Sequence, residues 1–452
     1  MLGIGLVAGV GCGSKVPVDV RDPGALPIQG DNVTLYYDPG MMPCAGTLAH
    51  LDAAVAAIGR YLDLDLPVGD PIPYYYTQDL LPCSSGAAGC TIGPPQAVLS
   101  CWATKPTLVH ELVHAVKWRA IGLTNAFLEE GLAVSLGQLD FVGKVESRDP
   151  DAELLTPDKL PPDDYGVASD FVSYLLTRFG PGPFRKLVAS VRPGDAVEAI
   201  EAAFVAVYGE TMGALRADRA QSPLAFYGNR IDLPECQAEE PDPNIGRGAA
   251  VSETVDCATN TVGTVGTRYV PFEVAADGIY SVTVQHDAAS TFGLFACGGG
   301  PALWSADLGA SPLVVGHLHA GRYVFELDAG STSPETFSIT VAPVVLGTWP
   351  TCASLAPVAV PSGTESVYLF SMDDGALEVP FVLEDAATLV SVHPVVNLSS
   401  SRAQVCTSGC GAACTDADEA VDEPTLPAGA GFTLRASFAG QPKLVGVNLQ
   451  KP

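Results

Sequence analysis

Basic residues are scarce in this sequence. Lysine and arginine number 23 against 51 aspartates and glutamates, which gives a formal net charge of −28 at pH 7. A protein that binds nucleic acid neutralises phosphates with clustered basic side chains, and this chain has too few of them. We therefore expect no nucleic acid among its partners.

Long apolar runs are also missing. After the first dozen residues, no apolar stretch reaches the roughly 18 residues that suggest a transmembrane helix, so no internal membrane span is expected. The chain is nevertheless 47% hydrophobic and only 16% charged, which excludes a wholly disordered protein. Its 452 residues allow about two to four domains.

The first residues and the cysteines both indicate export. Residues 2–10 form a short apolar stretch of signal-peptide character, and Val10-Gly11-Cys12 resembles the end of a bacterial lipobox, although Gly9 stands where that motif prefers Leu. Twelve cysteines are unusual in a reducing compartment, and their spacing favours disulfides over structural zinc. We predict an extracytoplasmic bacterial protein that is secreted or anchored to a membrane through a lipid on Cys12.

Five segments of the chain differ in amino-acid composition and in the spacing of their apolar residues. Residues 1–30 join the signal-like stretch to a tether, residues 31–232 mix short strands with amphipathic helices, and residues 233–250 form a polar, proline-rich linker. Two β-rich units follow, at 251–345 and 346–452. The expected fold is a multidomain α+β protein, with a mostly helical N-terminal domain that contains a small sheet, then two all-β sandwich domains.

The two β-rich units repeat one pattern. Each opens at a cysteine and closes with an Ala-Gly turn followed by an aromatic strand, as in residues 319–325 and 427–432. The units resemble bacterial pre-peptidase C-terminal domains, which implies two β-sandwiches. Protein or glycan is the expected partner if these sandwiches bind anything.

The cysteine spacing suggests a disulfide framework. The repeat predicts one bridge in each β-rich unit, and close neighbours along the chain predict two local bridges. The four predicted pairs are Cys257–Cys297, Cys352–Cys406, Cys83–Cys90 and Cys410–Cys414.

An HExxH motif lies inside a helical run at residues 107–116. Residues four apart on a helix share a face, so His110 and His114 can both aim a ring nitrogen at one zinc ion. Glu111 follows His110 and can take a proton from a water on that metal. A zinc site with two histidines needs a third protein ligand.

Elimination favours a carboxylate as that third ligand. The metzincin pattern requires Gly and His at positions where this chain has Lys117 and Ala120. The only other histidine before the linker is His50, which we interpret as a structural residue. A second helical run follows the motif, and the short spacing between the two runs predicts a tight turn at residues 121–125, which Gly122 supports.

Residues 127–133, Phe-Leu-Glu-Glu-Gly-Leu-Ala, resemble the Trp-Leu-x-Glu-Gly-x-Ala segment of the gluzincin metallopeptidases, the peptidase MA group. This resemblance implies a zincin-like fold for residues 31–232. Carried over by position, Glu130 is the third zinc ligand and Glu129 is its variable neighbour.

A further resemblance begins at Tyr165. Residues 165–168, Tyr-Gly-Val-Ala, are similar to the start of a gluzincin helix whose first tyrosine, in the aminopeptidase branch, donates a hydrogen bond to the tetrahedral oxyanion. The resemblance implies this role for Tyr165. The Gly-x-Met-Glu-Asn sequence of that branch is absent, so exopeptidase activity is not supported.

These patterns predict an exported zinc metallopeptidase acting on a peptide or protein substrate. His110, His114 and Glu130 hold zinc, Glu111 is the general base and Tyr165 is the oxyanion donor. One alternative is a non-catalytic surface-binding protein that keeps the zincin fold as a scaffold, although a scaffold would not need Glu111. The other is a metal-dependent hydrolase of a non-peptide bond.

Overall fold

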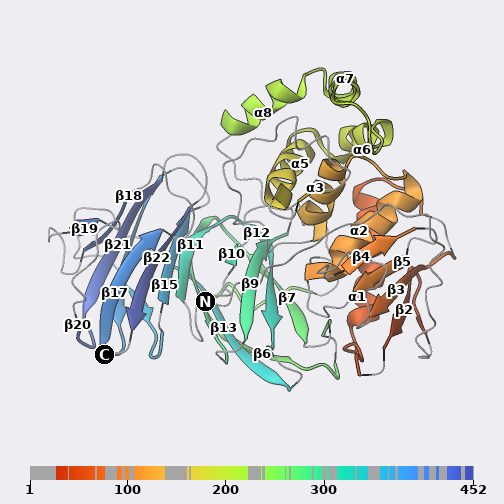
Figure 1. Ribbon diagram of the computed structural model, residues 1–452. Coiled ribbons are helices and arrows are strands. Elements are labelled where there is room, and N and C mark those ends of the chain that lie inside the picture. Colours follow the sequence, from red (N-terminus) through yellow and green to blue (C-terminus); the bar gives the residue numbers. More distant parts are fainter. Residues whose placement is uncertain are drawn as a thin grey trace.

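The chain is described from its computed structural model (Figure 1). The described residues are 27–38, 40–66, 69–76, 89–93, 97–100, 106–137, 160–161, 164–221, 236, 240–259, 261–263, 266–287, 290–297, 303–304, 313–330, 333–344, 357–364, 366–371, 375–394, 402–406, 414–416, 425–438 and 443–450. Helices occupy the first half of the chain and sheets dominate the second, which confirms the expected mixed α+β class. Cys12, on which the lipid-anchor prediction depends, lies outside the described residues.

A five-stranded sheet forms the right-hand edge of the molecule in Figure 1. Its strands, in the order β1-β2-β3-β5-β4, are β1 (Ile28–Gln29), β2 (Val33–Tyr37), β3 (Ile72–Tyr76), β5 (Ala97–Ser100) and β4 (Gly89–Ile92). Strands β2, β3 and β5 run parallel, and β4 pairs antiparallel with β5 at one edge. Helix α1 (Thr47–Tyr61) connects β2 to β3 as a crossover.

Six further helices follow along the chain, and among them α2 contacts this sheet. They are α2 (Pro106–Ala120), α3 (Ala126–Gly137), α5 (Tyr165–Phe179), α6 (Pro181–Ser190), α7 (Val197–Tyr208) and α8 (Met212–Gln221). Helix α2 packs on α1, β4 and β5, and α3 lies between α2 and α5. The apolar side chains of the sheet and these helices form one continuous core.

Two glycines let α3 approach its neighbours closely. A Cβ at Gly131 would lie 2.7 Å from the carbonyl oxygen of Ala168 on α5, and one at Gly137 would lie 2.6 Å from the backbone nitrogen of His110 on α2. Between α2 and α3, Gly122 has a φ of +99°, as the predicted tight turn requires. These two glycines therefore let α3 pack closely against both α5 and the part of α2 that carries His110.

The second half of the chain consists of strands. They are β6 (Ala250–Val255), β7 (Thr267–Val274), β8 (Gly278–Gln285), β9 (Thr291–Ala296), β10 (Leu303–Trp304), β11 (Leu313–Leu318), β12 (Gly321–Asp328), β13 (Glu335–Pro343), β14 (Val358–Val360), β15 (Ser366–Ser371), β16 (Gly375–Leu383), β17 (Ala387–Pro394), β18 (Arg402–Cys406), β19 (Cys414–Asp416), β20 (Thr425–Leu426), β21 (Gly431–Phe438) and β22 (Lys443–Gln450). They form sheets of order β10-β9-β12-β7, β20-β17-β22-β15-β11-β8-β13-β6 and β14-β16-β21-β18-β19.

Strand β11 joins the two predicted β-rich units into one sheet. It pairs antiparallel with β8 of the first unit and parallel with β15 of the second. Its side chains alternate between two cores: Leu313 and Val315 belong to the core of the second unit, whereas Val314 and Leu318 belong to that of the first. The units predicted at 251–345 and 346–452 therefore share a continuous eight-stranded sheet.

Two disulfides among the described residues differ from the pairing predicted for the first β-rich unit. Cys257 binds Cys44, with the Cα atoms 4.4 Å apart, and Cys297 binds Cys236, with the Cα atoms 5.7 Å apart. The predicted Cys257–Cys297 bridge is wrong. A repeated spacing shows which cysteines correspond between units, but it does not show which segment of the chain lies beside each one.

The third described disulfide also corrects the repeat argument. Cys406 on β18 and Cys414 on β19 face each other across an antiparallel pair and are bridged, with the Cα atoms 4.2 Å apart. The predicted Cys352–Cys406 and Cys410–Cys414 bridges are therefore wrong. Strand pairing brings Cys406 and Cys414 together, and the sequence did not reveal that pairing.

The Cys83–Cys90 bridge stays a prediction. Cys90, on β4, is disulfide-bonded, but Cys83 lies outside the described residues. The disulfides that are described suggest an extracytoplasmic protein. None of the described helices is long and apolar enough to cross a bilayer.

The Cys44–Cys257 bridge lies in a junction between the helical half and the β half. The backbone N–H groups of Cys44 and Gly46, just before α1, donate to carbonyl oxygens of Gly263 and Thr261 at 2.7 and 2.9 Å. The ring of His50, one turn into α1, stacks on Tyr269 of β7 with the centroids 5.5 Å apart. This contact agrees with the interpretation of His50 as a structural residue.

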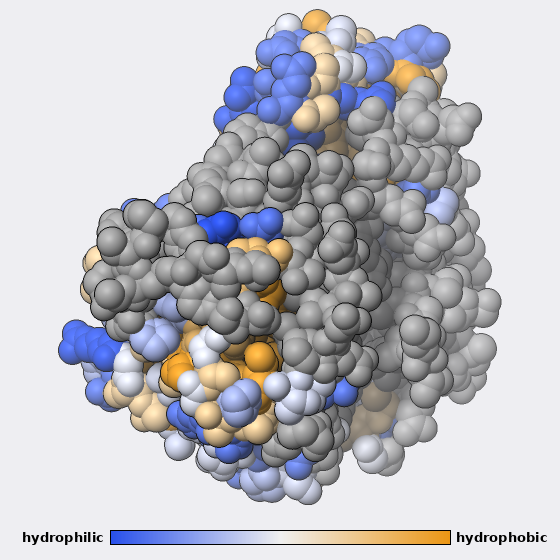
Figure 2. All heavy atoms as spheres, turned by 90° about the vertical axis from the view of Figure 1, so that its left-hand side faces the viewer, coloured by the Kyte–Doolittle hydropathy of each residue, from blue (hydrophilic) through white to orange (hydrophobic). Residues whose placement is uncertain are grey.

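The described surface differs between the top and bottom of the molecule in Figure 2. The top, where α7 and α8 lie in Figure 1, is mainly hydrophilic, with a few apolar residues. Lower down, apolar residues gather in one area that hydrophilic residues border.

Candidate metal centre

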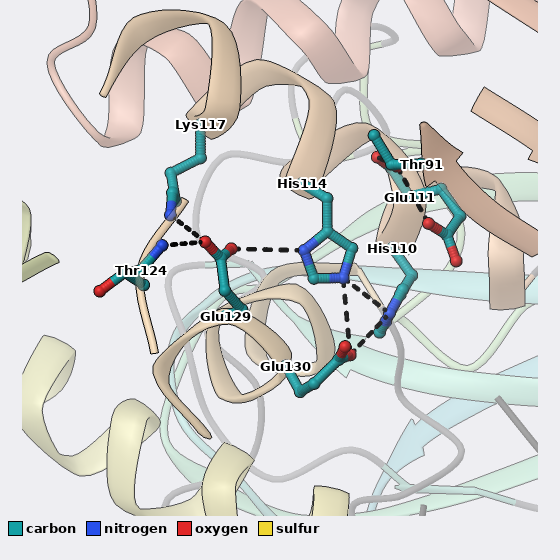
Figure 3. A network of polar contacts seen from close by, with 8 residues as sticks. All are labelled: Thr91, His110, Glu111, His114, Lys117, Thr124, Glu129 and Glu130. Atoms are coloured by element: carbon teal, nitrogen blue, oxygen red, sulfur yellow. Dashed lines mark hydrogen bonds and ion pairs between the residues drawn. The ribbon is translucent and has the colours of Figure 1, made fainter. Parts of the chain in front are cut away.

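The three predicted ligands meet in one place (Figure 3). His110 and His114 lie one turn apart on α2, and Glu130 reaches them from α3. Glu130 Oε2 lies 3.3 Å from His110 Nε2 and 3.5 Å from His114 Nε2, and the two Nε2 atoms are 3.2 Å apart. One ligand atom from each residue lies within 4.8 Å of the others, so this group could hold a metal ion.

The ligand atoms fit a metal ion better than they satisfy one another. All three residues are at most 6% exposed. Glu130 Oε2 is buried and has no hydrogen-bond partner among the described residues, although two ring nitrogens face it. A buried acceptor without a donor is costly. Two imidazole nitrogens and a carboxylate oxygen are a donor set that suits zinc.

The charges at this point favour a cation. Burial raises the pKa of the Glu130 carboxyl, but His114 and His110 outweigh that effect and bring the pKa to about 2. Burial lowers the pKa of His114, whereas Glu130 and Glu129 raise it by more and hold it well above its usual range. A metal ion that binds here displaces the proton of His114, so binding weakens as the pH falls.

Glu111 lies beside the cluster of His110, His114 and Glu130 and outside it. It is 2% exposed, and its Oε2 lies 3.0 Å from the hydroxyl of Thr91 on β4, which donates to it. The same hydroxyl lies 2.8 Å from the main-chain oxygen of Glu111. Figure 3 shows Glu111 and Thr91 next to His110, on the side away from Glu129. The edge strand thus fixes the orientation of a carboxylate adjacent to the predicted metal ligands.

Tyr165 contacts the same cluster from α5. Its side chain is fully buried, and its ring lies nearly parallel to that of His110, with the centroids 6.2 Å apart and the planes inclined by 7°. The structure therefore places this residue against His110, a predicted metal ligand, at the start of the helix that packs on α3. Its role as an oxyanion donor stays a prediction.

Glu129 and Lys117 are features of the site whose importance the sequence did not reveal. Glu129, interpreted as a variable neighbour of the ligand, is 7% exposed and lies 3.5 Å from Nδ1 of His114. Its other oxygen pairs with Nζ of Lys117, which is fully buried. The signal that could have shown this was the lysine itself: it lies three residues after His114, on the same face of a buried helix, and buried lysines are nearly always paired.

Comparisons with known proteins find little similarity. No family model and no curated protein matches this sequence. Among solved structures, the chain is similar to the pre-peptidase C-terminal domain of collagenase from Bacillus anthracis, at 14% identity over 23% of this chain and 97% of that one, with a TM-score of 0.18. A fucolectin from striped bass (Morone saxatilis) serum matches at 10% identity over 46% of this chain and 97% of its own, with a TM-score of 0.12.

The protein YhaK from Escherichia coli is similar at 10% identity over 49% of this chain and 97% of its own length, with a TM-score of 0.12. All three scores are too low to define the fold or to support a function. The collagenase domain is of the kind that the β-rich units resemble in sequence, and its match extends over less than a quarter of this chain.

Proposed function

We propose that this chain is an extracytoplasmic, zinc-dependent peptidase of gluzincin type. The observation that carries the proposal is the buried His110–His114–Glu130 cluster with the carboxylate of Glu111 beside it. The sequence resemblance to the peptidase MA group supports the same assignment. The β-rich units would accompany this domain as pre-peptidase C-terminal-like sandwiches.

The residues divide the chemistry between them. His110, His114 and Glu130 would hold the zinc, which when bound acidifies a water and polarises a carbonyl. Glu111 would accept a proton from the attacking water and return it to the leaving amine. Tyr165 donates a hydrogen bond to the oxyanion that forms on the peptide carbonyl. The substrate class is therefore a peptide or a protein.

Metal removal tests the proposal directly. The full chain, incubated with a peptide library, should cleave peptide bonds, lose that activity after treatment with a chelator, and regain it when about one equivalent of Zn²⁺ is added, as expected of a site with three protein ligands. Mass spectrometry of the products measures the cleavage. Stoichiometric zinc binding without cleavage of any peptide would contradict the peptidase and favour either a binding protein or a hydrolase of another bond.

Tyr165→Phe tests the oxyanion donor. Removing one such donor typically lowers kcat about 10²–10³-fold, with little change in KM. The ring is kept, so its contact with His110 and the buried packing should persist, and zinc content should equal that of the wild type. Steady-state kinetics with a cleaved library peptide measure the effect. Unchanged turnover would show that Tyr165 only packs against His110.

A further inference from the structure

We propose that Lys117 and Glu129 are positioning residues for the metal centre: Lys117 orients the Glu129 carboxylate, and Glu129 in turn holds Nδ1 of His114 so that its Nε2 faces the metal. The inference rests on the metal binding of the proposed function. It assigns a role to two charged residues that take no part in ligation or in the proposed proton transfers.

The two carboxylate oxygens of Glu129 contact different partners (Figure 3). Oε1 accepts from Lys117 Nζ and, at 2.7 Å, from the backbone N–H of Thr124. Oε2 lies 3.5 Å from Nδ1 of His114. Because two donors hold Oε1, the carboxylate has little freedom to rotate, and Oε2 stays directed at the ring of His114.

All parts of this network come from two elements and the turn that joins them. His114 and Lys117 lie on α2, Thr124 lies in the turn after it, and Glu129 lies in the first turn of α3. The next residue, Glu130, is itself a predicted ligand. The contact between Lys117 and Glu129 therefore sets how α3 presents Glu130 to α2 as well as how His114 is oriented.

Lys117 and Glu129 form an ion pair that is buried away from water. Lys117 is fully buried, and the Glu129 side chain is only 9% exposed. Removing one charge of a buried pair leaves the other uncompensated, which is much more costly than removing both. Burial raises the pKa of the Glu129 carboxyl, but Lys117 and His114 lower it by more.

The consequence for the metal is an assignment of the His114 tautomer. A carboxylate beside Nδ1 accepts a hydrogen bond from the N–H there and keeps the proton on Nδ1, which leaves the Nε2 lone pair free for a metal ion and increases its basicity. His110 differs, because its Nδ1 is buried without a hydrogen-bond partner among the described residues. Among the described residues, a carboxylate therefore lies beside Nδ1 of His114 and not beside Nδ1 of His110.

Glu129→Gln decides the proposal, because it removes the charge with almost no change in volume. The full chain is stripped of metal, and its affinity for Zn²⁺ is measured by competition with a chromophoric chelator, with thermal unfolding followed in parallel. The expected result is a loss of about 10–100-fold in affinity, the usual effect of removing a partner of a metal-binding histidine. Wild-type affinity in this variant would overturn the inference.

The Lys117→Met, Glu129→Gln double variant separates positioning from stability. It leaves no unpaired buried charge, so its unfolding temperature should recover relative to Glu129→Gln. Its zinc affinity should stay as low as that of Glu129→Gln, because no carboxylate faces His114. Recovery of affinity together with stability would show a purely structural role and overturn the inference.

A buried ion pair away from the metal provides the matched control. Arg219 of α8 binds Asp170 of α5 at 2.6 Å, with both side chains less than a fifth exposed. Arg219→Met should lower stability and leave zinc affinity unchanged, and an equal loss of affinity in this control would overturn the inference.

A wild-type chain that binds no zinc would overturn the proposed function itself, whereas zinc affinity that does not change in Glu129→Gln would overturn only the positioning role.

Discussion

Glu111→Gln is expected to remove nearly all peptide hydrolysis while leaving the metal in place. A positioned general base typically contributes about 10²–10⁴-fold to the rate, and glutamine cannot accept the proton. The substitution keeps the volume of a side chain that is only 2% exposed, and the Thr91 hydroxyl can still donate to the amide oxygen. The kcat for a library peptide and the zinc content of the same sample measure the two effects.

The control for this variant is an exposed glutamate in the same half of the chain. Glu198 lies in the first turn of α7 with its side chain exposed, and Glu198→Gln should leave both kcat and zinc content as in the wild type. Turnover close to wild type in Glu111→Gln would remove Glu111 as the base. Loss of zinc from that variant would instead show that Glu111 acts as a ligand.

Replacing both Cys44 and Cys257 by alanine is expected to lower the free energy of unfolding more than removing either of the other two disulfides described above. The bridge closes a loop with a sequence separation of 213, for which the chain-entropy model predicts a contribution of about 5 kcal/mol to the free energy of unfolding. In that model the contribution arises because the bridge restrains the unfolded chain. Urea denaturation without reductant measures it.

The Cys406–Cys414 bridge is the matched comparison. It has a sequence separation of only 8, and the same model predicts about 2–3 kcal/mol for its removal. The Cys44, Cys257 variant should therefore lose about twice as much. Equal losses would show that the two bridges act through local packing rather than through the length of the loop that each one closes.

The candidate metal site was largely predictable because its determinants are local. A four-residue spacing on one helix brings His110 and His114 together, and the short turn around Gly122 returns the chain so that α3 can present Glu130. Each step depends on residues that are close in sequence. The orientation of Glu129 was not predictable in the same way, since it depends on which side of α3 faces a buried Lys117.

The disulfides and the sheet order were not predictable because they depend on distant partners. Cys44 precedes α1, and nothing near it in the sequence shows that it lies against Cys257. Alternating apolar residues identify strands in both β-rich units, but alternation does not say which strands are neighbours. The parallel pairing of β11 with β15 is therefore a result that only the structure provides.

The pairing of β11 with β15 limits how the chain can be divided into recombinant fragments. A cut after β13 would leave the main-chain N–H and C=O groups along one side of β11 unpaired, and would also expose Leu313 and Val315, which pack in the core beyond that cut. Open strand edges with apolar side chains are templates for aggregation. We therefore expect either β-rich unit to stay folded in a recombinant protein only when the other is present beside it.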